Sequence, residues 1–230
     1  MILRLDTPGG SATSMRAMAA TIAAAPMPVV VYVHPNGARA DSAGVILTLA
    51  ADVAAMAPLT NIGSATPVWI GPPARSASED RLLRDLRRKA INDGVAFART
   101  LAEDHGRNAD LAEQMVRVAK NVSATAAERE GLVDVVAPSE QALLRSLDGF
   151  AVKGHKAQRL QTAGLELRHF SDAVDSGEDF DPEDSSFWRS FAYVFGAAGI
   201  VMVTAVGSAR GRASWRRRQR RRRRMRARRH

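Results

Sequence analysis

Residues 29–57, VVVYVHPNGARADSAGVILTLAADVAAMA, carry the pattern that decides the fold of this chain. The β-branched run 29–33 has no polar alternation, which is typical of a strand that is buried on both faces. Turn-forming residues follow at 34–37, and then an apolar segment of helical composition at 42–51 and a further apolar run at 52–57. Strand, helix and strand in so short a stretch predict βα units and a mainly parallel sheet.

The same alternation continues on both sides of this stretch. Towards the N-terminus, residues 2–5 predict a strand, and residues 11–25 predict a helix that is capped by Ser11 or Ser14. Towards the C-terminus the pattern predicts helices at 81–105 and 110–120, a short helix that opens on a capping box at Thr125, a strand at 132–136 and a helix at 139–147. We therefore assign residues 1–150 to one α/β domain.

Residues 58–80 interrupt the alternation with four prolines and scattered serine and glycine. A loop of this length within a compact domain is usually a lid, a binding flap or a disordered segment. Val68, Trp69 and Ile70 lie near its middle, and we expect these apolar side chains to contact a substrate.

Composition and charge exclude several classes of site. The chain has no cysteine, so disulfides, thiolate nucleophiles and cysteine-ligated metals are absent. The histidines at 105, 155, 169 and 230 are scattered and form no metal-ligand set by spacing, so we expect neither a metal nor a cofactor. Residues 210–230 hold 13 of the 33 basic residues and no acidic one, which leaves 20 basic against 24 acidic residues elsewhere, a net charge of −4. The high net charge therefore belongs to a tail, and nucleic-acid binding by the folded part is not expected.

The region after residue 150 reads as three segments. Residues 151–190 are rich in acidic residues and predict a solvated linker. Residues 191–209 are nineteen residues without a charge, roughly 28 Å as a helix, which predicts a single membrane span; a buried soluble helix is the alternative. The arginine-rich tail 210–230 then predicts a cytoplasmic C-terminus, with the folded domain outside the cytoplasm and residues 191–230 in contact with lipid. Nucleic-acid binding by the tail is the competing interpretation.

Ser42 is the candidate nucleophile. It stands between a buried strand and an apolar helix, where free N–H groups and the helix dipole favour developing negative charge. Gly9 and Gly10 follow another strand, and such strand ends meet at one edge of a parallel sheet. On position alone, however, a serine before a helix is most often an N-cap.

Four segments in chain order, LDTPGG at 5–10, GARADSAG at 37–44, MAPLTNIGSATPV at 56–68 and KAIND at 89–93, resemble the ClpP-class membrane serine proteases of the NfeD family. The resemblance implies a ClpP/crotonase-like fold, a mainly parallel sheet with flanking helices. It also implies a dyad of Ser42 and Lys89, with Lys89 as general base, and an oxyanion hole made by the N–H groups of Gly10 and Ala43. A stomatin-like membrane protein is the implied partner or substrate, and we expect a homo-oligomer.

The chain departs from this family at several points. Asp41 precedes the serine where the family has a small residue, and its carboxylate could hold Lys89 in the protonated form. Residues 1–5 read as a strand interior, so we expect the fold to be N-terminally incomplete. A catalytically inactive scaffold that binds a stomatin-like partner is thus the main alternative, followed by a crotonase-type acyl-CoA enzyme. A triad of Ser42, His34 and either Asp6 or Asp52 is a further alternative.

Overall fold

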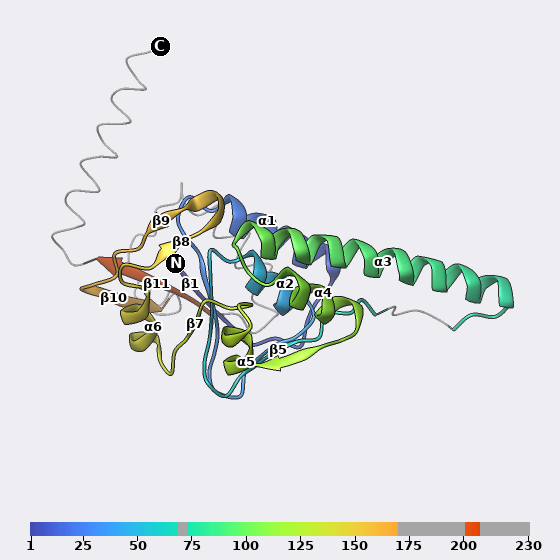
Figure 1. The fold of residues 1–230 in the computed structure, drawn as a ribbon, viewed down its shortest axis with the longest axis horizontal. Helices are drawn as coiled ribbons and strands as arrows, with labels where there is room; N and C mark the ends of the chain where they lie inside the picture. Colours follow the sequence, from blue (N-terminus) through green and yellow to red (C-terminus); the bar gives the residue numbers. More distant parts are fainter. Residues whose placement is uncertain (69–72, 170–200, 208–230) are drawn as a thin grey trace, which may run out of the picture.

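A central six-stranded sheet organises the protein in the computed structural model, which describes residues 1–68, 73–169 and 201–207 (Figure 1). The strand order is β10-β11-β1-β2-β4-β7. These strands are β1 (Ile2–Leu5), β2 (Val30–Val33), β4 (Val53–Met56), β7 (Val135–Val136), β10 (Leu165–His169) and β11 (Val201–Gly207). Strands β1, β2, β4 and β7 are parallel, whereas β11 runs antiparallel to both β1 and β10. The predicted α/β fold with a mainly parallel sheet is confirmed.

Helices cover this sheet because alternate strand residues supply apolar side chains to opposite faces. Leu3, Val31 and Val33 face one buried cluster, to which α1 (Ala12–Ala24), α2 (Ala43–Ala50), α3 (Ala77–Asp104) and α4 (Ala109–Arg117) contribute. Ile2, Val30 and Tyr32 face a second cluster that α6 (Glu140–Leu147) completes. The short helix α5 (Ala124–Arg129) precedes β7.

Two smaller sheets complete the described fold. Strands β3 (Arg39–Ala40), β5 (Asn61–Gly63) and β6 (Asn121–Ser123) form one of them. Strands β8 (Ala151–Val152) and β9 (Gln158–Arg159) form the other, and the one-turn helix η1 (Gly154–Lys156) joins them. Sequence patterns missed β3, β5 and β6, because strands of two or three residues are too short to show a period.

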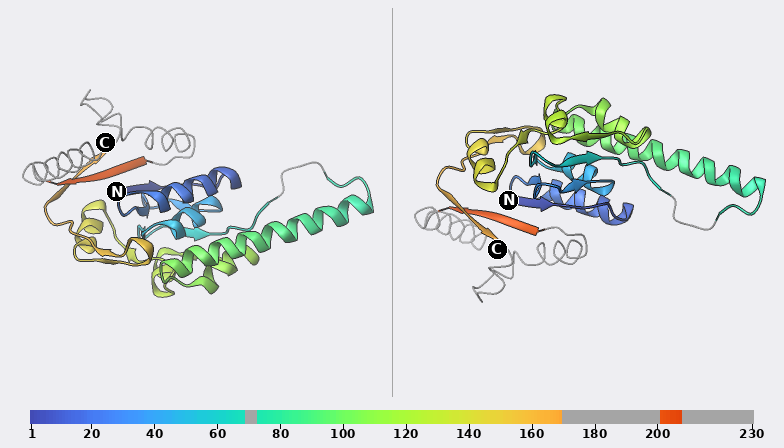
Figure 2. Two further views of the ribbon diagram at one scale, coloured as in Figure 1. Left: turned by 90° about the horizontal axis from the view of Figure 1, so that it is seen from above. Right: turned by 90° about the horizontal axis from the view of Figure 1, so that it is seen from below.

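The long helix α3 has two halves with different surroundings. Val95, Ala98 and Ala102 in its second half are buried in the core, whereas most side chains from Ala77 to Ala90 are exposed. The first half therefore projects beyond the rest of the body, as Figures 1 and 2 show.

Three expectations about element boundaries differ from the structure. The cap of α5 is Ser123, whose hydroxyl accepts the Ala126 N–H, and not Thr125. The loop expected at 58–80 contains strand β5, and α3 already begins at Ala77. The expected linker 151–190 contains β8, η1, β9 and β10 in the part that the structure describes, residues 151–169, where Val152 is buried in the core and neighbouring apolar side chains pack against it. Residues 170–190 lie outside the described residues.

The expected membrane helix, residues 191–209, lies largely outside the described residues. The structure describes only its part 201–207, and describes it as strand β11. Within the described ranges, no helix has both the length and the apolar character that a membrane span requires. The tail 210–230 also lies outside the described residues.

Candidate active site

Ser42 occupies the N-cap position of α2 but does not act as a cap. The side chains of four other N-cap serines, at 11, 76, 123 and 139, each accept a backbone N–H of the first helical turn. Ser42 makes no such bond, and its backbone has φ 52° and ψ −110°, a conformation that L-residues rarely adopt. Its hydroxyl makes no hydrogen bond within the described parts of the chain, so the N-cap interpretation fails and the hydroxyl is free to react.

The turn after β1 lies directly against Ser42. A Cβ added to Gly9 would stand 2.7 Å from the Ser42 Cβ and 3.2 Å from its Oγ, and Gly9 has φ +127°. The Thr7 hydroxyl accepts the Gly9 N–H at 3.1 Å, which fixes this turn. Glycine is required here both by the backbone conformation and by the close approach.

Two backbone donors beside Ser42 have no acceptor. Within residues 1–68 and the other described ranges, neither the Gly10 N–H nor the Ala43 N–H makes a backbone hydrogen bond. The two residues are neighbours, since a Cβ added to Gly10 would lie 3.9 Å from the Ala43 Cβ. Unpaired donors next to a free hydroxyl are the arrangement that an oxyanion hole needs.

The segment after β5 holds Ser42 from the other side. The Ser42 N–H donates to the Ser64 carbonyl at 2.6 Å, and the Thr66 hydroxyl donates to the Val116 carbonyl at 2.7 Å. This segment leads to Val68, which is 79% exposed. Trp69 and Ile70, the other two residues of the expected substrate contact, lie outside the described residues.

Asp41 engages neighbours other than Lys89. One carboxylate oxygen lies 3.4 Å from the Arg39 guanidinium and the other accepts from the Asn61 amide at 3.4 Å. Burial nevertheless raises the pKa of Asp41 above its usual value, with Arg39 acting in the opposite direction. The expected contact between Asp41 and Lys89 is not formed.

Lys89 lies on the projecting half of α3 and is exposed. Its ammonium makes no hydrogen bond or ion pair with any residue that the structure describes, Ser42 included. The structure therefore leaves the proposed dyad unassembled, because the body of the domain does not enclose the first half of α3.

The alternative triad is also not assembled. The His34 ring stacks on Tyr32, with 4.8 Å between the ring centroids. Asp6 accepts the Arg39 N–H at 3.1 Å, and Asp52 accepts the Val29 N–H at 2.7 Å. Among the described residues, nothing joins His34 to either aspartate or to Ser42.

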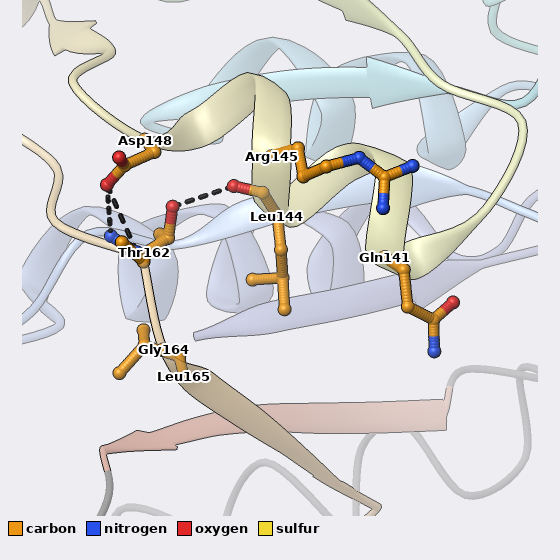
Figure 3. Close-up of a pocket in the computed structure, with 8 residues that line it drawn as sticks. Gln141, Leu144, Arg145, Asp148, Thr162, Gly164 and Leu165 are labelled. Carbon is orange, nitrogen blue, oxygen red and sulfur yellow. Dashed lines mark hydrogen bonds between the residues drawn. The ribbon is translucent and has the colours of Figure 1, made fainter.

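A cavity of about 330 Å³ lies away from Ser42, between α6 and the segment before β10 (Figure 3). Its wall is tied together by the Thr162 hydroxyl, which donates to the Leu144 carbonyl at 2.7 Å, and by Asp148, which accepts the Thr162 N–H at 2.9 Å. None of the residues around Ser42 lines this cavity, so it supplies no substrate site for that serine.

A cluster that the spacing of histidines did not reveal lies at the end of α3. Asp104, His105 and His155 place one ligand atom each within 4.8 Å of one another. Fifty residues separate the two histidines, and only the tertiary fold brings them together.

Replacing Gly9 with alanine is expected to lower any activity of Ser42 by about 10- to 100-fold, because a misplaced reacting atom costs that much. The added Cβ would displace the Ser42 side chain, and the positive φ would also cost about 1–3 kcal/mol of stability. Turnover of a peptide substrate and thermal unfolding measure the two effects.

Gly37→Ala is the matched control for this change. Gly37 has φ +88°, but apart from its chain neighbours no atom of the described residues lies within 4 Å of an added Cβ. The substitution therefore has the same backbone cost but does not displace Ser42. Equal losses of activity in both variants would show that Gly9 has no special relation to the serine.

Comparisons with known proteins give consistent results. No protein-family model matches the chain. The chain is 33% identical over 153 residues to the membrane-bound protease PH1510 of Pyrococcus horikoshii. The aligned residues are 66% of this chain and 33% of that protein. The chain thus spans about a third of the length of this curated relative.

Solved structures of a 1510-N membrane-bound stomatin-specific protease are similar in fold. A lysine-to-alanine mutant in complex with a substrate peptide has a TM-score of 0.64 at 30% identity, over 76% of this chain and 80% of that one. A serine-to-alanine mutant has a TM-score of 0.60 at 30% identity, over 70% and 75% of the two chains.

Proposed function

Because the chain belongs to the NfeD-type family of ClpP-like membrane serine proteases, we propose that it is a serine endopeptidase with Ser42 as its nucleophile. The observation that carries the proposal is the state of Ser42 itself. The Ser42 hydroxyl does not cap α2, the Ser42 backbone has a positive φ, and Gly9, which has no side chain, leaves space beside the hydroxyl. The Gly10 and Ala43 N–H groups, which make no backbone hydrogen bond to any described residue, would serve as the donors to the developing oxyanion.

The chemistry would follow the usual acyl-enzyme course. The Ser42 Oγ attacks the scissile carbonyl, and its proton passes to the neutral amine of Lys89. The negative charge that forms on the carbonyl oxygen is stabilised by the two N–H groups. The C–N bond then breaks, the leaving amine takes the proton from Lys89, and water hydrolyses the ester on Ser42.

For this reaction, the Lys89 amine would have to be desolvated and lie close to the Ser42 hydroxyl. Because the half of α3 that carries Lys89 projects from the body, we propose that a bound substrate or a second copy of the chain covers Lys89 and excludes water from it. The apolar residues of the substrate would contact Val68, Trp69 and Ile70. The segment that carries these three residues begins at the hydrogen bond between Ser64 and Ser42, so it starts beside the nucleophile.

The relatives and the sequence support a proposal for the substrate class and for the location of the protein. We propose that the substrate is an apolar segment of a membrane-associated protein, and that a stomatin-like protein is its source, because the related protease is named as stomatin-specific. Residues 191–209 would anchor the chain as a single span. The domain would then be extracytoplasmic, and the tail 210–230 would lie against lipid in the cytoplasm.

One observation favours a second function. The exposed and unpartnered state of Lys89 is what a scaffold without catalysis would show, with the same fold binding a stomatin-like protein. A cleavage assay separates the two functions. The full chain in detergent is incubated with a labelled apolar peptide from a stomatin-like C-terminal region, and the products are identified by mass. Cleavage supports the peptidase, whereas binding of the peptide without any cleavage supports the scaffold.

Replacing Lys89 with alanine is expected to lower kcat by about 10²- to 10⁴-fold, the range for loss of a general base. Lys89→Arg is expected not to restore it, because a guanidinium stays protonated. Arg87→Ala removes a neighbouring exposed cation from the same helix and is expected to leave kcat unchanged. A Lys89→Ala enzyme that cleaves as fast as Arg87→Ala would exclude Lys89 as the base.

A further inference from the structure

Three potential metal ligands meet where α3 ends. Asp104 is the last residue of α3, His105 is its C-cap, and His155 lies in η1. The Asp104 Oδ2 lies 2.9 Å from the His155 Nδ1 and 3.8 Å from the His105 Nε2. Ligand atoms at 2.0–2.2 Å from a tetrahedral Zn²⁺ are about 3.4 Å apart, and the two observed spacings bracket this value.

The His105 ring is already in the form that binds a metal. Its Nδ1 lies 3.0 Å from the Leu101 carbonyl, so Nδ1 carries the proton and donates it to that oxygen. In the neutral ring this leaves a lone pair on Nε2. The Nε2 atom is buried and has no hydrogen-bond partner among the described residues, and the side chain is only 3% exposed. A buried acceptor without a partner costs free energy unless something occupies it.

His155 directs one ring nitrogen towards the Asp104 carboxylate. Its Nε2 lies 3.2 Å from the Ala23 carbonyl, and a carbonyl can only accept, so this nitrogen donates. The remaining nitrogen, Nδ1, then faces the Asp104 carboxylate at 2.9 Å. A lone pair and a carboxylate oxygen at this distance require a cation between them, which is either a proton on Nδ1 or a metal ion.

Two of the three positive side chains near the cluster are compensated by acidic partners. Arg107 is paired with Asp134 at 2.7 Å, and Lys156 is paired with Asp52 at 2.9 Å. The third, Lys153, lies beside Gly106, where its Nζ would be 3.6 Å from an added Cβ, and its flexible side chain can turn towards solvent. The C-terminus of the long helix α3 contributes partial negative charge at the site. Asp104 and His155 are both exposed, which gives an ion a path from solvent.

We propose that Asp104, His105 and His155 bind a divalent transition-metal ion of the Zn²⁺ type through one oxygen and two imidazole nitrogens, with water completing a tetrahedral shell. Imidazole and carboxylate together suit this group of ions. The site lies outside the Ser42 machinery and is independent of the proposed peptidase function. A bound ion would join the end of α3 to η1, and through the His155–Ala23 bond to the end of α1.

Cobalt substitution tests the site directly. The full chain, purified without a histidine tag and treated with chelator, is titrated with Co²⁺ at about pH 8, where protons compete weakly for imidazole. We expect the visible ligand-field absorption of tetrahedral Co²⁺ at a stoichiometry of one, and its disappearance when Zn²⁺ displaces the cobalt. We also expect Zn²⁺ to raise the Tm of the chain.

His155→Gln and Asp104→Asn are expected to weaken Zn²⁺ binding by at least about 100-fold and to abolish the Tm shift. Glu103→Gln is the matched control, because Glu103 is an exposed carboxylate beside Asp104 that is paired with Arg99 and not with the cluster. Circular dichroism verifies that each variant is folded. Absence of the tetrahedral spectrum in the wild-type chain, or Zn²⁺ binding by His155→Gln as tight as that of the control, would overturn the site.

Discussion

Replacing Ser42 with alanine is expected to lower kcat for peptide cleavage by at least about 1,000-fold, because the acyl-enzyme can then no longer form. The fold is expected to be unaffected. The Ser42 hydroxyl makes no hydrogen bond to any residue that the structure describes, and its backbone N–H bond to the Ser64 carbonyl does not depend on the side chain. Turnover of the labelled peptide measures the effect, and circular dichroism verifies the fold.

Ser64→Ala is the matched control for the nucleophile. The hydrogen bond between Ser64 and Ser42 uses the Ser64 backbone carbonyl, so removal of the Ser64 hydroxyl is expected to change kcat little. If Ser42→Ala retained the turnover of Ser64→Ala, another residue would have to be the nucleophile and the proposed peptidase site would be wrong.

Replacing Arg107 with alanine is expected to destabilise the protein by about 3–5 kcal/mol, the cost of breaking a buried ion pair by removing one partner. The Arg107 side chain is only 1% exposed, and it donates to the Leu49 and Ala51 carbonyls at the end of α2 at 2.8 and 2.9 Å. It also pairs with Asp134 at 2.7 Å, and Asp134 in turn accepts the Ala54 N–H of β4. Its loss would leave all of these acceptors buried and poorly satisfied. Urea unfolding of both proteins measures the difference.

Arg99→Ala provides the contrast for this stability prediction. Arg99 has ion pairs to Glu103, Asp110 and Glu113, but these pairs lie at the surface of α3 and α4. Exposed ion pairs contribute little because water and salt screen them, so we expect a loss several-fold smaller than for Arg107→Ala. Equal losses in the two variants would show that burial of Arg107 does not govern its contribution.

The helices and strands that bury large apolar faces could be predicted from the sequence alone. The run 29–33 became β2, and the predicted helix at 11–25 became α1 with Ser11 as its cap. Short strands such as β3 and β5 depend on partners that are distant in the chain, and no local period marks them. The resemblance to the NfeD-type proteases is confirmed by the comparisons.

The candidate site was predictable in part. The position of Ser42 at the start of a helix followed from composition, but its positive φ and its unused hydroxyl depend on how β1 and β5 approach it. The exposure of Lys89 could not be foreseen, because an amphipathic helix does not reveal which of its turns lie beyond the body. The cluster of His105 and His155 likewise exists only through the packing of η1 against the end of α3.

Covalent labelling tests the central claim, that Ser42 is an activated nucleophile, most directly. The full chain is incubated with a fluorophosphonate, digested, and the modified peptide is located by mass spectrometry. We predict a single label on Ser42 that is absent from Ser42→Ala and forms more slowly in Lys89→Ala. A label that persists in Ser42→Ala, or peptide cleavage by a chain in which Ser42 is never labelled, would contradict the claim.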